Sequence, residues 1–295
     1  MPNWVYNEIR FKSAEDCRRV AQLMQSKNSN FDFNKVIPIP EYLKRIEAFS
    51  PKTHVRALAY AFSKGKHITK QELKAAIKAA YPQIKEVEIT PPLDASLEYS
   101  HDIRPPYVLS QGDLHTLLYY ANFSDYDQEI ANYQPILTYR PKTYADYAEL
   151  VKRALFETGS LDWYDWSWRH WGTKWNAYNV DIRNKSIYWE TAWEPSANVV
   201  MAIHKQTNIP LYYLYTEEQI SVMAGEMIFN KQKVKICQTD NASECYQLAA
   251  FMNVIDPQEC RLADDDSIVY EEDDGWKSAQ SLPPKATLAK EFSSL

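Results

Sequence analysis

Three acidic residues and one histidine border a tryptophan-rich stretch of the sequence and could together bind a metal ion. They are Asp162, Asp165, His170 and Glu190. Carboxylate and imidazole groups are common ligands of divalent metals, so this set would suit a metal-dependent enzyme acting on nucleic acid. The spacing of the four residues matches no known metal motif. In a second interpretation, Asp162 and Asp165 cap a helix or bond to the nearby indoles.

No established catalytic motif occurs anywhere in the sequence. The chain lacks H-E-x-x-H, G-x-S-x-G, a Walker loop and G-x-G-x-x-G. Only six glycines occur in 295 residues, which leaves few candidates for a loop that cradles a phosphate group. We therefore predict no catalytic residue and no cofactor, and we expect a binding protein in preference to an enzyme.

Aromatic residues concentrate in the same stretch and could form a binding surface. Seven of the nine tryptophans lie between Trp163 and Trp193. The spacing predicts that Tyr164, Trp168, Trp171 and Trp175 share a helix face and that Trp189 and Trp193 share a strand face. The six side chains could form a packed aromatic core, with their polar atoms bonded to neighbours. The alternative is a platform on which bases or another flat ligand stack.

A basic stretch lies earlier in the chain. From Lys52 to Lys85 there are eight Lys and Arg residues and a single acid. The spacing of Lys70, Lys74 and Lys78 places them in one stripe along a helix. Further candidates for the basic surface are Lys64, Lys66 and Lys85. Such a stripe could bind a phosphate backbone, or it could be a solvated helix face.

An acidic stretch lies near the C-terminus. From Asp256 to Asp274 there are nine Asp and Glu residues and a single base. The candidates for an acidic surface are Asp264, Asp265, Asp266, Glu271, Glu272, Asp273 and Asp274. This stretch could imitate a row of phosphates and occupy a nucleic-acid-binding partner, or it could be a pair of charged loops. The spacing of its acids is not that of an EF-hand calcium loop.

The composition indicates a globular protein. Of the 295 residues, 45% are hydrophobic and 24% are charged, and the net charge is −6. The four cysteines are scattered and form no disulfide framework, and the N-terminus has no signal-peptide pattern. Apolar runs are too short to cross a bilayer. We therefore expect a cytoplasmic protein with no membrane partner.

The elements that would position these residues follow a recognisable order. Alternating residues predict a strand at 4–11, and Ser13 begins a helix. A hairpin is predicted over 176–193, then a helix after Ser196 and strands near 211–215 and 223–229. This order is β-α-β-β-α-β, the ferredoxin-like split βαβ arrangement of an α+β protein. It divides the chain into a domain of residues 1–40 plus 160–232, a helical insertion at 41–159, and an acidic C-terminal extension at 233–295.

Several segments of this domain resemble a known family. They are MPNW at 1–4 with Asn7, FDFNKVIP at 31–38, DWYDW at 162–166, WGTKWNAY at 171–178, ETAWEP at 190–195 and AGE at 224–226. Together they resemble the YubB-type ferredoxin-like family carried by phages, conjugative plasmids and genomic islands. The resemblance covers residues 1–40 and 160–232. It implies the fold and an origin on a mobile element, and it implies no activity.

These observations lead to three hypotheses for the function. The first is a non-enzymatic accessory protein of a mobile element that contacts a protein partner, or another macromolecule of the host or the element. The second is a nucleic-acid-binding protein that uses the lysine stripe and the tryptophans. The third is the metal-dependent enzyme described above.

Overall fold

The computed structural model describes residues 3–46, 51–82, 111–122, 128, 130, 131, 133, 141–231, 233–271, 273 and 279–295. The chain divides into two compact units. One unit contains Met1–Pro38 and Ser167–Leu295, and the other contains Ile39–Trp166. The first unit is thus built from both ends of the chain, and the second is inserted between them.

The two-ended unit is an α+β structure built on a six-stranded antiparallel sheet. Its strands are β1 (Trp4–Arg10), β2 (Tyr178–Ile182), β3 (Ser186–Ala192), β4 (Leu211–Glu217), β5 (Ala224–Asn230) and β6 (Lys233–Thr239). They lie in the order β2-β3-β1-β4-β5-β6. The hairpin predicted over 176–193 is confirmed as β2 and β3. Residues 233–239, assigned from the sequence to an extension, form the edge strand of this sheet.

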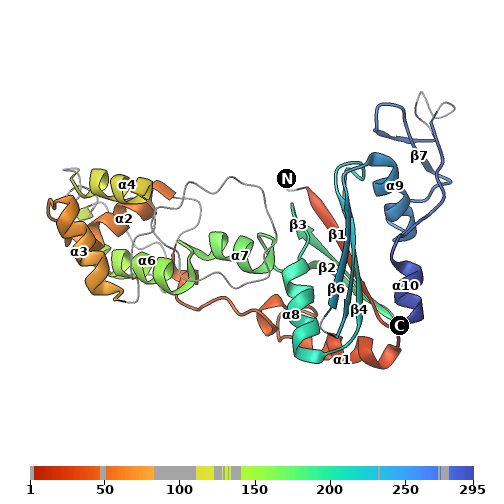
Figure 1. The fold of residues 1–295 in the computed structure, drawn as a ribbon, viewed down its shortest axis with the longest axis horizontal. Coiled ribbons are helices and arrows are strands. Elements are labelled where there is room, and N and C mark those ends of the chain that lie inside the picture. The colour runs from red at the N-terminus through yellow and green to blue at the C-terminus, as the bar shows by residue number, and fades with distance from the viewer. Residues whose placement is uncertain are drawn as a thin grey trace. The chain divides into compact units, whose positions relative to one another are not determined.

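Helices cover both faces of the sheet (Figure 1). One face carries α1 (Ala14–Met24) and α8 (Ala197–Thr207), and the other carries α9 (Ala242–Phe251) and α10 (Ala289–Ser294). The unit also contains the short helix η1 (Phe33–Lys35) and a separate hairpin of β7 (Cys260–Leu262) and β8 (Ile268–Tyr270). Strand β1 lies at the centre of the sheet, where Val5 and Ile9 are fully buried.

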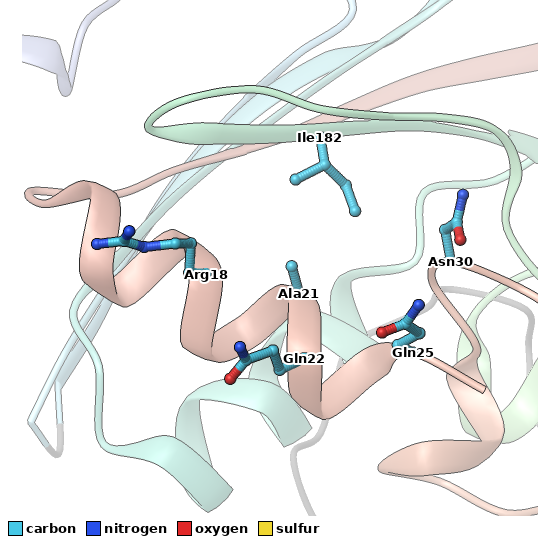
Figure 2. Close-up of a pocket in the computed structure, with 6 residues that line it drawn as sticks. All are labelled: Arg18, Ala21, Gln22, Gln25, Asn30 and Ile182. Atoms are coloured by element: carbon cyan, nitrogen blue, oxygen red, sulfur yellow. The ribbon is translucent and has the colours of Figure 1, made fainter.

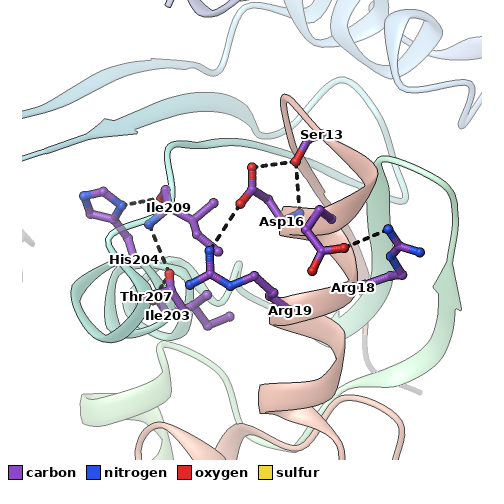
Figure 3. Close-up of polar contacts among 9 residues, drawn as sticks. Ser13, Asp16, Arg18, Arg19, Ile203, His204, Thr207 and Ile209 are labelled. Carbon is purple, nitrogen blue, oxygen red and sulfur yellow. Dashed lines mark hydrogen bonds and ion pairs between the residues drawn. The ribbon is translucent and has the colours of Figure 1, made fainter.

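The first helix begins where the sequence predicts. The Ser13 hydroxyl accepts a hydrogen bond from the Asp16 amide at 3.0 Å and donates to the Asp16 carboxylate at 2.7 Å (Figure 3). This cap satisfies an amide at the helix end that has no partner within the helix. Cys17, Val20 and Met24 then form the buried face.

The inserted unit is helical in its described residues. It contains η2 (Leu43–Arg45), α2 (Pro51–Ser63), α3 (Lys70–Ala80), α4 (Gln111–Ala121) and α6 (Tyr144–Thr158). Helix α2 packs against α6, α4 and α3, and Phe62 meets Phe156 edge to face at 5.8 Å between ring centroids. Thr69 and Glu72 form a capping box at the start of α3. Gly159 ends α6 with a φ of 70°. Helix α7 (Trp163–Trp171) crosses from this unit into the first one.

None of the helices formed by described residues has both the length and the apolar character that a membrane span requires.

Candidate functional site

Two of the segments singled out in the sequence contact each other directly. The Asn176 amide nitrogen donates to the Asp32 carboxylate at 2.7 Å, and the Phe33 backbone amide donates to the Asn176 side-chain oxygen at 2.9 Å. The Trp171 indole donates to the Ile37 carbonyl at 2.9 Å. These bonds hold residues 171–178 against residues 31–38. Hydrogen bonds from Asn34 and Asn176 keep the pKa of Asp32 below its usual value, although burial alone would raise it.

A buried polar network holds the turn that follows β3. The side chain of Asn7, in the central strand, is fully buried. Its amide nitrogen donates to Thr191 Oγ1 at 2.9 Å, and its oxygen accepts from the Tyr213 hydroxyl at 2.6 Å and the Ser196 amide at 3.3 Å. Thr191 in turn donates to the Glu194 carbonyl at 2.7 Å. The turn at 193–196 is therefore tied to the middle of the sheet.

The loop after α7 fits closely against this turn. Gly172 has a φ of +83°, and a Cβ atom there would lie 2.9 Å from the Pro195 carbonyl oxygen. Only glycine meets both conditions without strain. The next residue, Thr173, is buried and donates its hydroxyl proton to the Ala192 carbonyl at 2.9 Å. The loop and the turn thus form one packed structure.

This structure presents three indoles and an ammonium group, which we call the Trp–Lys cluster: Trp168, Lys174, Trp175 and Trp193. The ring of Trp193 stacks on Trp168 at 6.2 Å and lies 5.7 Å from Trp175, measured between centroids. Lys174 Nζ lies over both Trp175 and Trp193, 4.3 and 4.8 Å from the ring centres. Partial burial lowers the pKa of Lys174.

The backbone of Trp193 is unusual. Its φ is +65°, in the left-handed region that bulky residues rarely occupy. A conformation of this kind costs about 1–3 kcal/mol and persists only where surrounding contacts hold it. The Asn7 network and a bond from the Trp193 amide to the Asn3 carbonyl at 2.8 Å supply those contacts. Because Trp175 is 39% exposed, the cluster can offer an indole face and a cation to a planar or aromatic group.

The structure separates the six aromatic candidates. Trp171 and Trp189 are buried, so neither can stack on a ligand. Helix α7 ends at Trp171, because Gly172 turns the chain, and Trp175 therefore does not share a helix face with Trp168. Trp193 lies beyond the end of β3, so it does not share a strand face with Trp189. Tyr164 is half-buried in the part of α7 that belongs to the inserted unit.

Three of the four candidate metal ligands have other roles in the structure. Asp162 accepts from the Asp165 amide at 2.8 Å and pairs with buried His54 at 3.6 Å, and Asp165 accepts from the Leu161 amide at 3.2 Å. These bonds cap α7. Glu190 lies on β3 and accepts from the Tyr188 hydroxyl at 3.2 Å. The fourth candidate, His170, is half-buried. Within the described residues, no group of three His, Cys, Asp or Glu side chains could hold a metal ion.

The basic candidates lie on the inserted unit. Lys70, Lys74 and Lys78 are exposed along α3, opposite the buried Leu73 and Ile77. Lys64 and Lys66 are exposed in the loop before α3. None of these five lysines forms an ion pair with a residue that the structure describes. Lys85 lies outside the described residues.

The acidic candidates lie on the β7–β8 hairpin and just after it. Asp264, Asp265 and Asp266 are exposed at its turn, where Asp265 accepts from the Ser267 amide at 3.1 Å and from its hydroxyl at 2.6 Å. Glu271 and Asp273 are also exposed, and Asp273 accepts from the Tyr270 amide at 2.6 Å. Glu272 and Asp274 lie outside the described residues. Several of these acids therefore shape turns.

A small depression lies between α1 and the edge strand β2 (Figure 2). It is lined by Arg18, Ala21, Gln22, Gln25, Asn30 and Ile182 and holds about 160 Å³. This volume is below the roughly 300 Å³ at which small-molecule pockets begin. The residues that line it do not form a set of groups that would bind one ligand, so we assign it no ligand.

Sequence reasoning missed two features of the site. Lys174 was not among the candidates, although it lies directly between Thr173 and Trp175 in a tryptophan-rich segment. The role of Asn7 was also missed, because its alternation with Val5 and Ile9 showed which face it shares but not what it bonds. A polar residue at a core position of a central strand was the available signal.

Comparison with protein-family models finds no match, and neither does comparison with curated proteins. One similar solved structure is the crystal structure of protein api92 from Yersinia pseudotuberculosis, of the DUF1281 family model. The two are 10% identical, with a TM-score of 0.32, and the alignment covers 80% of this chain and 98% of the other. Similarity at this level carries no argument about function.

Proposed function

We propose that this chain is a non-enzymatic binding protein of a mobile genetic element and that it contacts a protein partner through the Trp–Lys cluster. The observation that carries the proposal is the cluster itself. It keeps an indole partly exposed beside a cation, on a turn with a left-handed residue that a buried network holds in place. Tryptophan is enriched among the residues that dominate binding energy at protein interfaces.

The order of the strands supports the interpretation of the fold as ferredoxin-like. The first four strands lie in the order β2-β3-β1-β4, with α1 and α8 on one face, as expected for a ferredoxin-like domain. Strands β5 and β6 would then be additions to it. The segments that resemble the YubB-type family meet in this domain: Asn7 bonds to the turn of 190–195, and residues 171–178 pack against 31–38. This convergence supports membership of that family and the mobile-element origin that it implies.

The test is quantitative capture of partners by the tagged protein from cells that carry its mobile element. Trp175→Ala should reduce the recovery of a bound protein by about ten-fold or more, because interface tryptophans dominate affinity. Lys174→Ala removes the ammonium group that lies over Trp175 and Trp193, and it should reduce recovery by about three-fold. The matched control is Tyr270→Ala, which removes another exposed aromatic ring of the same unit. The proposal would be contradicted if the unaltered protein and its three variants recovered a partner equally, or if none of them recovered one.

A second function is favoured by the five exposed lysines on and before α3. Because these lysines form no ion pair with a described residue, they are available to a phosphate backbone. A single-stranded nucleic acid would also find aromatic faces to stack on in the protein. The overall charge of −6 weakens attraction to nucleic acid by the molecule as a whole, so the stripe would have to act locally.

A further inference from the structure

A second group of aromatic side chains lies on the sheet face opposite α1 and α8. Register places Tyr6 of β1 beside Glu190 of β3, and Glu190 beside Tyr178 of β2, so their side chains share a face. Trp4 stacks on Tyr178 at 5.2 Å and Tyr6 stacks on Tyr188 at 6.3 Å, measured between ring centroids. We call these four rings the aromatic floor.

The helices on this face cover its other half. The hydrophobic cluster beneath α9 and α10 takes its strand residues from β4 and β5, with Tyr6 and Cys237 at its margin. Arg10 marks the border, because it donates to the Phe251 carbonyl at 3.2 Å and lies 4.6 Å from the centre of that ring. Beyond the border Tyr178 is 56% exposed. The aromatic floor is therefore accessible on the β2–β3 side.

The charges around the floor are unbalanced. Two pairs neutralise themselves, Glu8 with Arg10 and Asp181 with Arg183. Glu190 and Glu218 have no cationic partner among the described residues: Glu190 accepts from Tyr188 and Asn179, and Glu218 accepts from the Trp4 amide at 3.0 Å.

Burial is the main cause of a raised pKa in two tyrosines of the floor, and the nearby carboxylates add to it. Burial raises the pKa of Tyr6, and the Glu190 and Glu218 carboxylates raise it further. Burial, the charge of Glu190 and a hydrogen bond to it raise the pKa of Tyr188. The contributions of the carboxylates agree with a negative electrostatic potential over the floor, which attracts cations.

We propose that the aromatic floor, with Glu190 and Glu218, is a docking surface for an arginine- or lysine-rich segment of a partner protein. Guanidinium and ammonium groups bind to aromatic faces by cation–π attraction, and the two carboxylates complete the pairing. The floor already accepts one cation, because the Arg183 guanidinium lies 5.7 Å from the centre of the Tyr188 ring. A nucleic acid would bring phosphates to a negative surface, so it fits less well.

This proposal goes beyond the proposed function, because it uses different residues from the Trp–Lys cluster. The two can fail separately: the variants used below leave Trp168, Lys174, Trp175 and Trp193 in place.

The experiment measures binding of a fluorescent oligo-arginine peptide to the full-length protein by anisotropy at low salt. Tyr178→Leu keeps apolar bulk but removes the π face, and Glu190→Gln keeps the shape but removes the charge. Each should weaken binding by about three-fold, and the double variant by about ten-fold. The matched controls are Asp264→Asn, an exposed carboxylate at the hairpin turn, and Tyr119→Leu, a tyrosine of similar exposure (60%) in the other unit.

The controls decide between specific and general attraction. The proposal holds if the two floor variants weaken binding and the two controls do not, with thermal unfolding unchanged. Equal weakening by Asp264→Asn would show that the peptide senses only overall charge, and would overturn it. Absence of peptide binding would overturn it as well. So would tighter binding of a single-stranded oligothymidine that is lost in Tyr178→Leu, because the floor would then serve nucleic acid.

Discussion

Asn7 connects the core of the sheet to the surface of the candidate site. It is a polar side chain in a central strand, with Val5 and Ile9 on the same face. A buried amide at such a position is stable only if its donors and acceptors are paired. Here the pairing reaches the turn that carries Trp193. A residue remote from solvent therefore sets the geometry of an exposed indole cluster.

Replacing Asn7 by Ala should lower the free energy of unfolding by about 3 kcal/mol. The substitution removes the side chain that accepts from the Tyr213 hydroxyl and the Ser196 amide and that donates to Thr191, and each buried hydrogen bond lost costs roughly 1–3 kcal/mol. Urea unfolding followed by circular dichroism measures the loss. Asn28→Ala, at an exposed position, is the control and should change stability by less than about 0.5 kcal/mol. A loss at Asn7 no greater than at Asn28 would show that the network contributes nothing to stability.

At the scale of elements, the starts of helices could be read from the sequence, whereas contacts between distant segments could not. Ser13, Thr69 and Thr143 begin helices because the capping bonds join residues three apart in sequence. A glycine after a helical run is also a local stop signal, and Gly172, with a φ of +83°, ends α7 and takes Trp175 off its expected face. The close fit of Gly172 against the Pro195 carbonyl is a contact between distant segments, which no local pattern encodes. The burial of Trp189 likewise follows from packing on Phe31 and Tyr213, which lie far away in sequence.

A buried carboxylate of the sheet binds the segment that begins helix α10. Glu226 of β5 is 4% exposed and accepts from the backbone amides of Thr287 at 2.6 Å and Leu288 at 2.9 Å, and from the Tyr212 hydroxyl. The bonds anchor the two residues that directly precede the helix. Phe292 then packs on Tyr212 with ring centroids 5.3 Å apart.

Glu226→Ala should release this helix without unfolding the sheet. Amide hydrogen exchange of Leu288 and Phe292 should accelerate by about 100-fold, which corresponds to a loss of roughly 3 kcal/mol in local stability. Glu291→Ala is the matched control, because it removes an exposed carboxylate of α10 that pairs with Lys235. Exposed pairs contribute at most about 1 kcal/mol, so exchange there should rise by less than ten-fold. Equal acceleration in both variants would contradict the role assigned to Glu226.

At the scale of the whole molecule, opposite charges lie on different units. The lysine stripe of α3 lies on the inserted unit, whereas the acidic hairpin turn and the aromatic floor lie on the two-ended unit. The sequence indicated this asymmetry, because runs of charge are visible without a fold. It could not show that residues 233–239 complete the sheet, because pairing of β6 with β5 depends on a partner strand as well as on local alternation.

Because the lysine stripe lies on one unit, substitutions confined to that unit can test the nucleic-acid hypothesis. If Lys70, Lys74 and Lys78 each contact a phosphate of a single strand, each contributes about 0.7 to the slope of log affinity against log salt. Replacing all three by Gln should therefore reduce that slope by about 2, as measured by oligothymidine anisotropy over a salt series. The matched control replaces Lys27, Lys185 and Lys205, exposed lysines of the other unit, by Gln. It alters total charge equally, so a similar change in slope would assign the binding to net charge and not to the stripe. An unchanged slope in the α3 variant would exclude the stripe as the contact surface.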